Sequence, residues 1–249
     1  MHIGILKTDA VRTEWVAQFG EYPDMFVQLV GSANPEATFS TWDVEEGIHP
    51  TQDDIDSVDG FIITGSKSSA YEDKQWIRDL EGLIQRLHAA RKKMVGICFG
   101  HQVIAQALGG VVSKSDKGWG VGINVYELGG APFKDGHTGQ LKLIASHQDQ
   151  VHVLPPGAQN VVSNPHCENA GFVMGDHIFT LQGHPEFVPN YSEAIMAFRC
   201  DMIGSERVAE GRASLETHQH EGAKVASWMV DFFASNSQVN SPEGRNLKK

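Results

Sequence analysis

One cysteine lies in a short, glycine-flanked segment that could hold a nucleophile. Residues 96–100 read Gly-Ile-Cys-Phe-Gly, a G-x-C-x-G pattern between an apolar run at 94–98 and a stretch of helical character. A sharp strand-to-helix turn pushes its central side chain outward, and the flanking glycines relieve the crowding. The helix start favours a thiolate at Cys98, and the Phe99 N–H would face an oxyanion formed there. A buried structural cysteine at the end of a core strand is the alternative.

A second segment offers a general base and a group to orient it. Residues 182–186 read Gln-Gly-His-Pro-Glu and follow an apolar stretch expected to be a strand. His184 and Glu186 are two residues apart, so in extended backbone they point to the same side. The carboxylate would set the imidazole tautomer and favour the imidazolium, which leaves Cys98 as a thiolate. His101 is a rival base near Cys98, but it is expected to project away from the strand ends.

The apolar pattern of the first half predicts the elements that would position these residues. It indicates strands at 2–6, 38–44, 60–64 and 94–98, and helices at 73–92 and 100–108. A further helix is expected to begin near Val11, with Asp9 as its cap. Strands that alternate with helices imply a parallel sheet with crossover connections.

The second half has a different pattern. Short strands are expected at 111–113, 121–128 and 140–145, and a hairpin at 170–174 and 178–182. Helices are expected at 191–202 and 222–234, with a short turn near Glu206 between them and a polar tail from Ser235. We expect one domain over 1–249, with a core of about residues 1–200 and C-terminal helices and tail at 201–249.

Taken together, the motifs resemble those of the class I glutamine amidotransferase family. The pattern GICFGHQ at 96–102 is followed by GHPE at 183–186, and the nucleophile-to-base separation is 184 − 98 = 86 residues. Residues 63–66 (ITGS) match the family's second oxyanion-hole loop, and S-H-x-D-x-V at 146–151 matches a segment that helps to hold substrate. The resemblance implies an α/β, three-layer, flavodoxin-like fold: a mostly parallel central sheet with flanking helices and a small antiparallel extension.

The resemblance also implies a role for each matching residue. Cys98 would be the nucleophile, His184 the acid–base and Glu186 its orienter. The backbone N–H groups of Ser66 and Phe99 would form the oxyanion hole. The groups that hold the α-amino and α-carboxylate ends of the substrate would be Gln102 and the backbone of Ser146 and His147. The implied reaction is thiolate attack on a γ-carboxamide, loss of ammonia or an amine, and hydrolysis of a γ-glutamyl thioester, with no cofactor.

One loop departs from the common family pattern. Many members have Gly-Gly-Pro in the oxyanion loop, whereas this sequence has Gly-Ser-Lys at 65–67. Residues 65–73 are more similar to the stand-alone, GMP-synthase-like branch that includes γ-glutamyl peptidases. A loop that lacks the second glycine and the proline is expected to have a different backbone and to shape a different pocket.

Composition limits the other classes of function. The net charge of −11 over 249 residues disfavours nonspecific binding to nucleic acid or anionic membrane. No apolar run approaches the roughly 20 residues that span a bilayer, and the start has no signal-peptide pattern. Three cysteines argue against a disulfide framework and favour a reducing compartment, so a cytoplasmic location is expected. The pair His218 and His220 is best explained as surface residues, so no metal site is predicted.

Three functions remain open at this point. The first is a free-standing hydrolase of glutamine or small γ-glutamyl compounds. The second is a glutaminase subunit that supplies ammonia to a separate synthase partner, because the roughly fifty residues after 200 are too few for an acceptor domain. The third is a regulatory or binding protein on the same fold, against which the intact set of Cys98, His184 and Glu186 argues.

Overall fold

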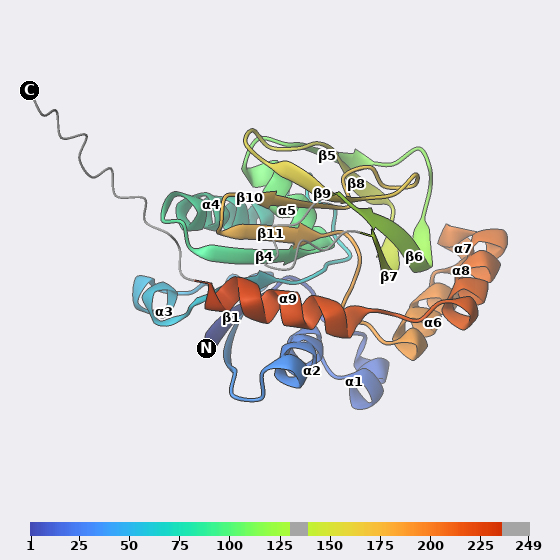
Figure 1. Cartoon of the computed structure of the whole chain (residues 1–249), viewed down its shortest axis with the longest axis horizontal. Helices are drawn as coiled ribbons and strands as arrows, with labels where there is room; N and C mark the ends of the chain where they lie inside the picture. Colours follow the sequence, from blue (N-terminus) through green and yellow to red (C-terminus); the bar gives the residue numbers. More distant parts are fainter. Residues whose placement is uncertain (130–138, 236–249) are drawn as a thin grey trace, which may run out of the picture.

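The computed structural model describes residues 1–129 and 139–235, whose centre is a nine-stranded sheet (Figure 1). Its order is β2-β1-β3-β4-β11-β10-β9-β6-β7. Five neighbouring strands are parallel: β2 (Thr38–Asp43), β1 (His2–Lys7), β3 (Gly60–Ile63), β4 (Lys93–Ile97) and β11 (Ile178–Leu181). Four antiparallel strands extend the sheet: β10 (Gly171–Met174), β9 (Gln159–Ser163), β6 (Gly120–Leu128) and β7 (Gly139–His147). A separate antiparallel pair joins β5 (Val111–Lys114) and β8 (Asp149–Val153).

Helices cover both faces of the parallel strands, which makes three layers (Figure 1). On one face lie α3 (Gln52–Ser57), α4 (Gln75–Ala89) and α5 (Phe99–Ala107). On the other lie α2 (Tyr22–Ala33) and α9 (Gly222–Ala234). In β3, Phe61 and Ile63 pack into the first core and Ile62 into the second. A strand that is buried on both sides has no polar face, which explains its continuous apolar run.

A third group of helices packs on the antiparallel extension. They are α6 (Pro189–Phe198), α7 (Cys200–Ile203) and α8 (Ser205–Thr217), and α6 and α8 contact β6 and β7. The helix α1 (Thr13–Phe19) lies near them, where Trp15 contacts Tyr191 and Phe198 edge-on. Gly122 has a φ of 67° and lies against Gly211 and Ser214 of α8, so a side chain there would collide with the helix.

The predicted α/β fold class, with its parallel sheet and antiparallel extension, is confirmed. The predicted hairpin is β10–β11, and the predicted helix at 222–234 is α9. The tail beyond Ser235 lies outside the described residues. Sequence reasoning assigned no element to α2, α3, β8 or β9.

Three local predictions were wrong. Asp9 does not cap the first helix, whose N-cap is Arg12, because its carboxylate accepts hydrogen bonds from Ala10 and Lys67 instead. The turn expected near Glu206 is the full helix α8, which packs on β6 through Val208 and Gly211. The single helix expected at 191–202 begins earlier and is interrupted at Arg199.

Within 1–129 and 139–235, none of the helices is both long and apolar enough to cross a lipid bilayer.

Candidate active site

Cys98 occupies a strained turn between β4 and α5. Its φ is 52° and its ψ is −103°, a region that non-glycine residues rarely adopt. The Cys98 N–H donates to the Leu181 carbonyl at 2.8 Å, and the side chain is nearly buried, with 5 % exposure. The flanking glycines are required by close packing: a Cβ on Gly96 would lie 2.6 Å from the Gly100 carbonyl oxygen, and one on Gly100 would overlap the carbonyl of Ile63. The structure therefore has the nucleophile turn that the G-x-C-x-G pattern predicts.

His184 and Glu186 form a buried pair on the loop after β11. The His184 Nδ1 lies 2.8 Å from the Glu186 Oε1, and the two residues are 3 % and 6 % exposed. The imidazole ring stacks on Phe187 with centroids 3.8 Å apart, and the His184 N–H donates to the Ile144 carbonyl at 2.8 Å. Because Glu186 engages Nδ1, the nitrogen left for Cys98 is Nε2.

The charges around His184 favour its imidazolium form. Burial alone would lower the pKa of His184, but the Glu186 carboxylate and the Cys98 thiolate, with hydrogen bonds to both, raise it to about 10. An imidazolium at neutral pH stabilises a neighbouring thiolate, and it also holds a proton for a leaving amine. The three residues can therefore act as nucleophile, acid–base and orienter.

His101, the alternative candidate for the general base, lies in the core between α5 and the sheet. It is fully buried in α5, and its Nδ1 hydrogen-bonds the Thr180 hydroxyl at 2.8 Å. Burial lowers the pKa of His101 to about 3, so the ring is neutral in the folded protein. His101 is thus a core residue of the sheet–helix interface.

Two glutamines form a hydrogen-bonded chain from Cys98 to the Asp149 carbonyl. The Gln102 Nε2 donates to the Asp149 carbonyl at 2.8 Å and to the Gln182 Oε1 at 3.0 Å. The Gln182 Nε2 in turn donates to the Cys98 sulfur, with the two atoms 3.5 Å apart. Sequence reasoning missed Gln182, although β11 and β4 are in register at Leu181 and Ile97, so the next residues, Gln182 and Cys98, meet at the sheet edge.

A cavity of about 340 Å³ opens beside Cys98. Its lining brings together the predicted Ser66, Gln102, Ser146 and His147. It also contains three cations and several aromatic or apolar side chains that sequence analysis did not assign to binding: Lys67, Lys114, Arg199, Tyr71 and Met202. Trp119 lines the cavity as well. The cationic lining suits a ligand that carries carboxylates.

His147 and Ser146, both predicted to bind substrate, differ from each other in burial and in hydrogen-bond partners. His147 is buried, its Nδ1 lies 3.3 Å from the Asp149 carbonyl, and burial together with the nearby His166 lowers its pKa to about 3. The imidazole is therefore neutral. Ser146 is half-buried, and its hydroxyl accepts a hydrogen bond from the Arg199 guanidinium at 3.4 Å. The helix break at Arg199 thus lies over the cavity, a position that no local sequence pattern indicated.

Gly65 and Ser66, which sequence analysis predicted to belong to an oxyanion loop, lie next to Cys98. A Cβ on Gly65 would be 3.6 Å from the Cys98 Cβ and 2.9 Å from the His184 Cε1, so this glycine permits close contact with both. Ser66, Cys98 and His184 also line a second, smaller cavity. Within 1–129 and 139–235, no residue accepts a hydrogen bond from the N–H of Ser66 or of Phe99. Both donors are available to a bound group.

No group of three His, Cys, Asp or Glu side chains in the described ranges is arranged to hold a metal ion. Of the histidines noted in the sequence, His220 donates its Nε2–H to the Pro185 carbonyl oxygen at 3.0 Å, in the segment between His184 and Glu186. His220 therefore supports the loop that carries His184 and Glu186.

Comparison with known proteins gives consistent results. The family model described as glutamine amidotransferase class-I matches residues 24–202. Gamma-glutamyl peptidase 3 of Arabidopsis thaliana is 36 % identical over 213 residues, which cover 81 % of this chain and 84 % of that protein. The glutamine-hydrolyzing GMP synthase of Bordetella parapertussis is 35 % identical over 59 % of this chain but only 29 % of its own length. The crystal structure of a glutamine amidotransferase from Thermotoga maritima superposes with a TM-score of 0.71 at 20 % identity, over 94 % of this chain and 96 % of that one.

Proposed function

The chain belongs to the class I glutamine amidotransferase family, and from this premise we propose that it is a free-standing hydrolase of γ-glutamyl amide bonds. The observation that carries the proposal is the buried Glu186–His184 pair beside Cys98, with the His184 pKa raised to about 10. Such a pair supplies a thiolate and a proton donor at neutral pH. A regulatory protein would have no need of this charge arrangement.

The proposed reaction begins when the Cys98 thiolate attacks the γ-carbonyl carbon and forms a C–S bond. The carbonyl π electrons move to oxygen, and the N–H groups of Ser66 and Phe99 would donate to the resulting oxyanion. The C–N bond then breaks, and the amine leaves with the proton from His184. Water attacks the γ-glutamyl thioester while His184 accepts its proton, and collapse releases glutamate and restores the thiolate.

The cavity supports a substrate with a free amino acid end. Both protons of the Gln102 Nε2 are engaged by Asp149 and Gln182, so its Oε1 is the atom left to accept from an α-ammonium group. The backbone at Ser146 and His147 is expected to hold the α-carboxylate. Lys67, Lys114 and Arg199 on the cavity wall favour a substrate with a second carboxylate, as the leaving part of a γ-glutamyl peptide has.

The similarity to γ-glutamyl peptidases supports the same substrate class. The partial match to a GMP synthase favours the second candidate, a glutaminase subunit that delivers ammonia to a synthase partner. The two functions differ in whether the chain works alone. A subunit would have low activity that rises with its partner, whereas a free-standing hydrolase would turn over without one.

The test is glutamate release by the purified chain from glutamine and from a panel of γ-glutamyl dipeptides. We expect release from dipeptides that is lost in Cys98→Ala and retained in Cys200→Ala, a matched change at a half-exposed cysteine. Release from no substrate, in a protein with intact folding, would refute the free-standing hydrolase. Release that is equal in Cys98→Ala would refute the assigned nucleophile.

We also propose that residues 1–249 act as one domain in the cytoplasm, with a small-molecule substrate and no nucleic-acid or membrane partner. The net charge of −11 and the free state of all three cysteines support this setting. Size-exclusion chromatography with and without DNA or anionic vesicles would test the absence of such partners.

A further inference from the structure

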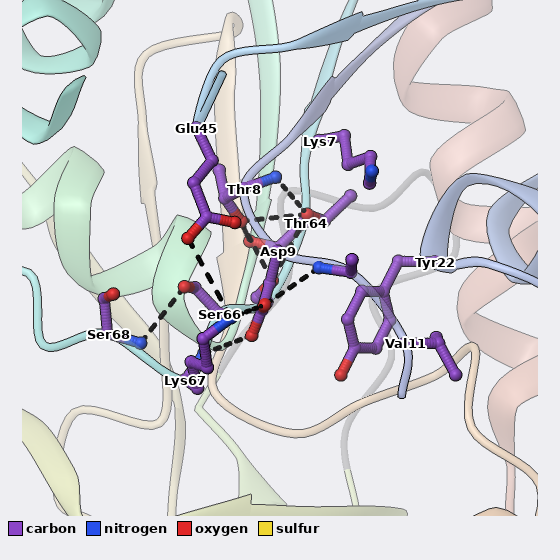
Figure 2. Close-up of polar contacts among 12 residues, drawn as sticks. Lys7, Thr8, Asp9, Val11, Tyr22, Glu45, Thr64, Ser66, Lys67 and Ser68 are labelled. Carbon is purple, nitrogen blue, oxygen red and sulfur yellow. Dashed lines mark hydrogen bonds and ion pairs between the residues drawn. The ribbon is translucent and has the colours of Figure 1, made fainter. Parts of the chain in front are cut away.

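The loop that follows β3 is held by side chains from the end of β1. Figure 2 shows Thr8 and Asp9 against the loop residues Thr64, Ser66 and Lys67. Thr8 and Asp9 are fully or almost fully buried, with 0 % and 3 % exposure. Buried polar groups are hydrogen-bonded in folded proteins, so the partners of these two residues define what they do.

The hydroxyl of Thr8 bonds the carbonyl of Gly65. The Thr8 N–H donates to the Thr64 Oγ1 at 3.0 Å, the two hydroxyl oxygens are 2.9 Å apart, and the Thr8 Oγ1 is 2.9 Å from the Gly65 oxygen. Each hydroxyl has a single proton to donate. The Thr64 hydroxyl also lies 3.2 Å from the Gly65 oxygen, and the Thr8 hydroxyl 3.2 Å from the Thr64 carbonyl oxygen. One assignment satisfies the three shorter contacts: Thr64 donates to Thr8, and Thr8 donates to Gly65.

This bond sets the direction of the next N–H. In a trans peptide the carbonyl and the following N–H point in opposite directions, so a Gly65 carbonyl turned toward Thr8 turns the Ser66 N–H away from it. The described part of the chain has no cis peptide. Away from Thr8 lie the two cavities that Ser66 lines together with Cys98.

The neighbouring peptide groups are held as well. The Thr64 carbonyl accepts the Gly100 N–H at 3.1 Å, which ties the loop to the first turn of α5. The Lys67 N–H donates to the Asp9 carboxylate at 2.7 Å, and the Lys67 ammonium bonds the same carboxylate. A proline at position 67, the residue common in the family pattern, has no N–H to donate. This chain therefore holds the loop with a buried carboxylate where a proline ring would otherwise restrict it.

We propose that Thr8 is a positioning residue that presets the oxyanion hole, and that Asp9 secures the following peptide by bonding Lys67. The inference rests on the proposed function in that the hole serves thioester chemistry at Cys98. A hole set by residues of the same chain is complete without a partner protein. The proposal thus explains how this chain could turn over alone.

The test separates acylation of Cys98, which passes through an oxyanion, from alkylation, which does not. The acylation probe is p-nitrophenyl acetate, read as the burst of nitrophenolate, and the alkylating probe is iodoacetamide. Cys98→Ala supplies the background for both. Neither probe needs γ-glutamyl recognition, so the result is independent of whether the natural substrate has been identified correctly.

The informative variants are Thr8→Val, which keeps the shape and removes the hydroxyl, and Thr8→Ser, which retains it. Since removal of one oxyanion donor costs about 10²- to 10³-fold, we expect Thr8→Val to acylate at least about tenfold more slowly. Alkylation should stay within about twofold of the wild-type rate, and Thr8→Ser should acylate at close to the wild-type rate.

A matched control is Thr180→Val, since Thr180 is also fully buried in the sheet but bonds His101 and Phe172 instead of the loop. We expect Thr180→Val to leave both rates near those of the wild type. The proposal is overturned if Thr8→Val acylates at the wild-type rate. It is equally overturned if, in Thr8→Val or in Thr8→Ser, the alkylation rate falls by as much as the acylation rate. The defect would then lie in the reactivity of Cys98 itself.

Discussion

The substitution Glu186→Gln tests whether the charge of this carboxylate, apart from its shape, maintains the catalytic pair. Glutamine can still accept the hydrogen bond from the His184 Nδ1–H, which Glu186 now accepts at 2.8 Å. The ring orientation should therefore be retained while the negative charge is lost. Because Glu186 is buried at 6 % exposure, little solvent is available to replace that charge.

The size of the effect follows from the pKa of His184. An increase from 6.5 to about 10 corresponds to about 5 kcal/mol in favour of the imidazolium, at about 1.4 kcal/mol per pKa unit. Burial opposes this increase and remains in the variant, and the contribution of Cys98 remains as well, so loss of the Glu186 charge should lower the His184 pKa. At pH 7.5 a return of this pKa to the ordinary value of 6.5 would reduce the imidazolium–thiolate pair by about tenfold.

Two assays measure the consequence. The rate of Cys98 alkylation by iodoacetamide should fall by about tenfold at pH 7.5, and kcat for glutamate release by about 10²- to 10⁴-fold because the acid–base is also impaired. Glu168→Gln, at an exposed carboxylate, is the matched control and should change neither rate. A Glu186→Gln enzyme that is alkylated at the wild-type rate across pH 6–9 would refute this account of the site.

The same pair makes stability depend on pH. A raised histidine pKa stabilises the folded state fully below the unfolded value of 6.5, and this stabilisation is lost as the pH rises through about 10. The difference in melting temperature between wild type and Glu186→Gln should therefore be larger at about pH 6.5 than at neutral pH, and it should shrink further toward pH 10. A constant difference across that range would contradict the assigned charge states.

Three further predictions concern other parts of the site and core. Gly100→Ala places a Cβ on the Ile63 carbonyl, and it should lower the free energy of unfolding in urea by about 3 kcal/mol, whereas Gly31→Ala, in open space, should not. Arg199→Ala should raise KM about tenfold for γ-glutamyl dipeptides but less for glutamine, because glutamine lacks the second carboxylate. An equal rise in KM for both substrates would contradict the assignment of Arg199 to that carboxylate. His101 has a folded pKa of about 3, so stability should fall as the pH drops from 6.5 to 3, and His101→Asn should make that decline shallower in urea titrations at several pH values.

The sheet and the catalytic pair were predictable because their signals are local. An apolar run such as 60–64, bounded by polar or small residues, can hardly be other than a buried strand, and Gly96 and Gly100 are required wherever a nucleophile turn is this tight. His184 and Glu186 are separated by one residue, so their meeting needs only extended backbone. The family resemblance then supplied their pairing with Cys98.

Contacts between distant segments were not predictable in this way. Asp9 looks like a helix cap because aspartate before an apolar stretch often is one, and only the fold reveals that Lys67, 58 residues away, is its partner. The helix α8 was underestimated because its face toward β6 is made of Val208 and Gly211, too few apolar residues to give a clear period. Arg199 was not predicted to line the cavity, because its position there depends on the break between α6 and α7.

The contact between His220 and the Pro185 carbonyl has a consequence for the order in which the protein becomes active. Glu221 also bonds the backbone of Lys142 in both directions, at 2.7 and 2.9 Å, so residues 220 and 221 join the catalytic loop to β7. A chain is synthesised from its N-terminus, and the parallel sheet can assemble well before these residues emerge. A nascent chain that ends before His220 would carry Cys98, His184 and Glu186 but lack the support behind Pro185, so enzymatic activity should arise only after residues 220 and 221 have been synthesised.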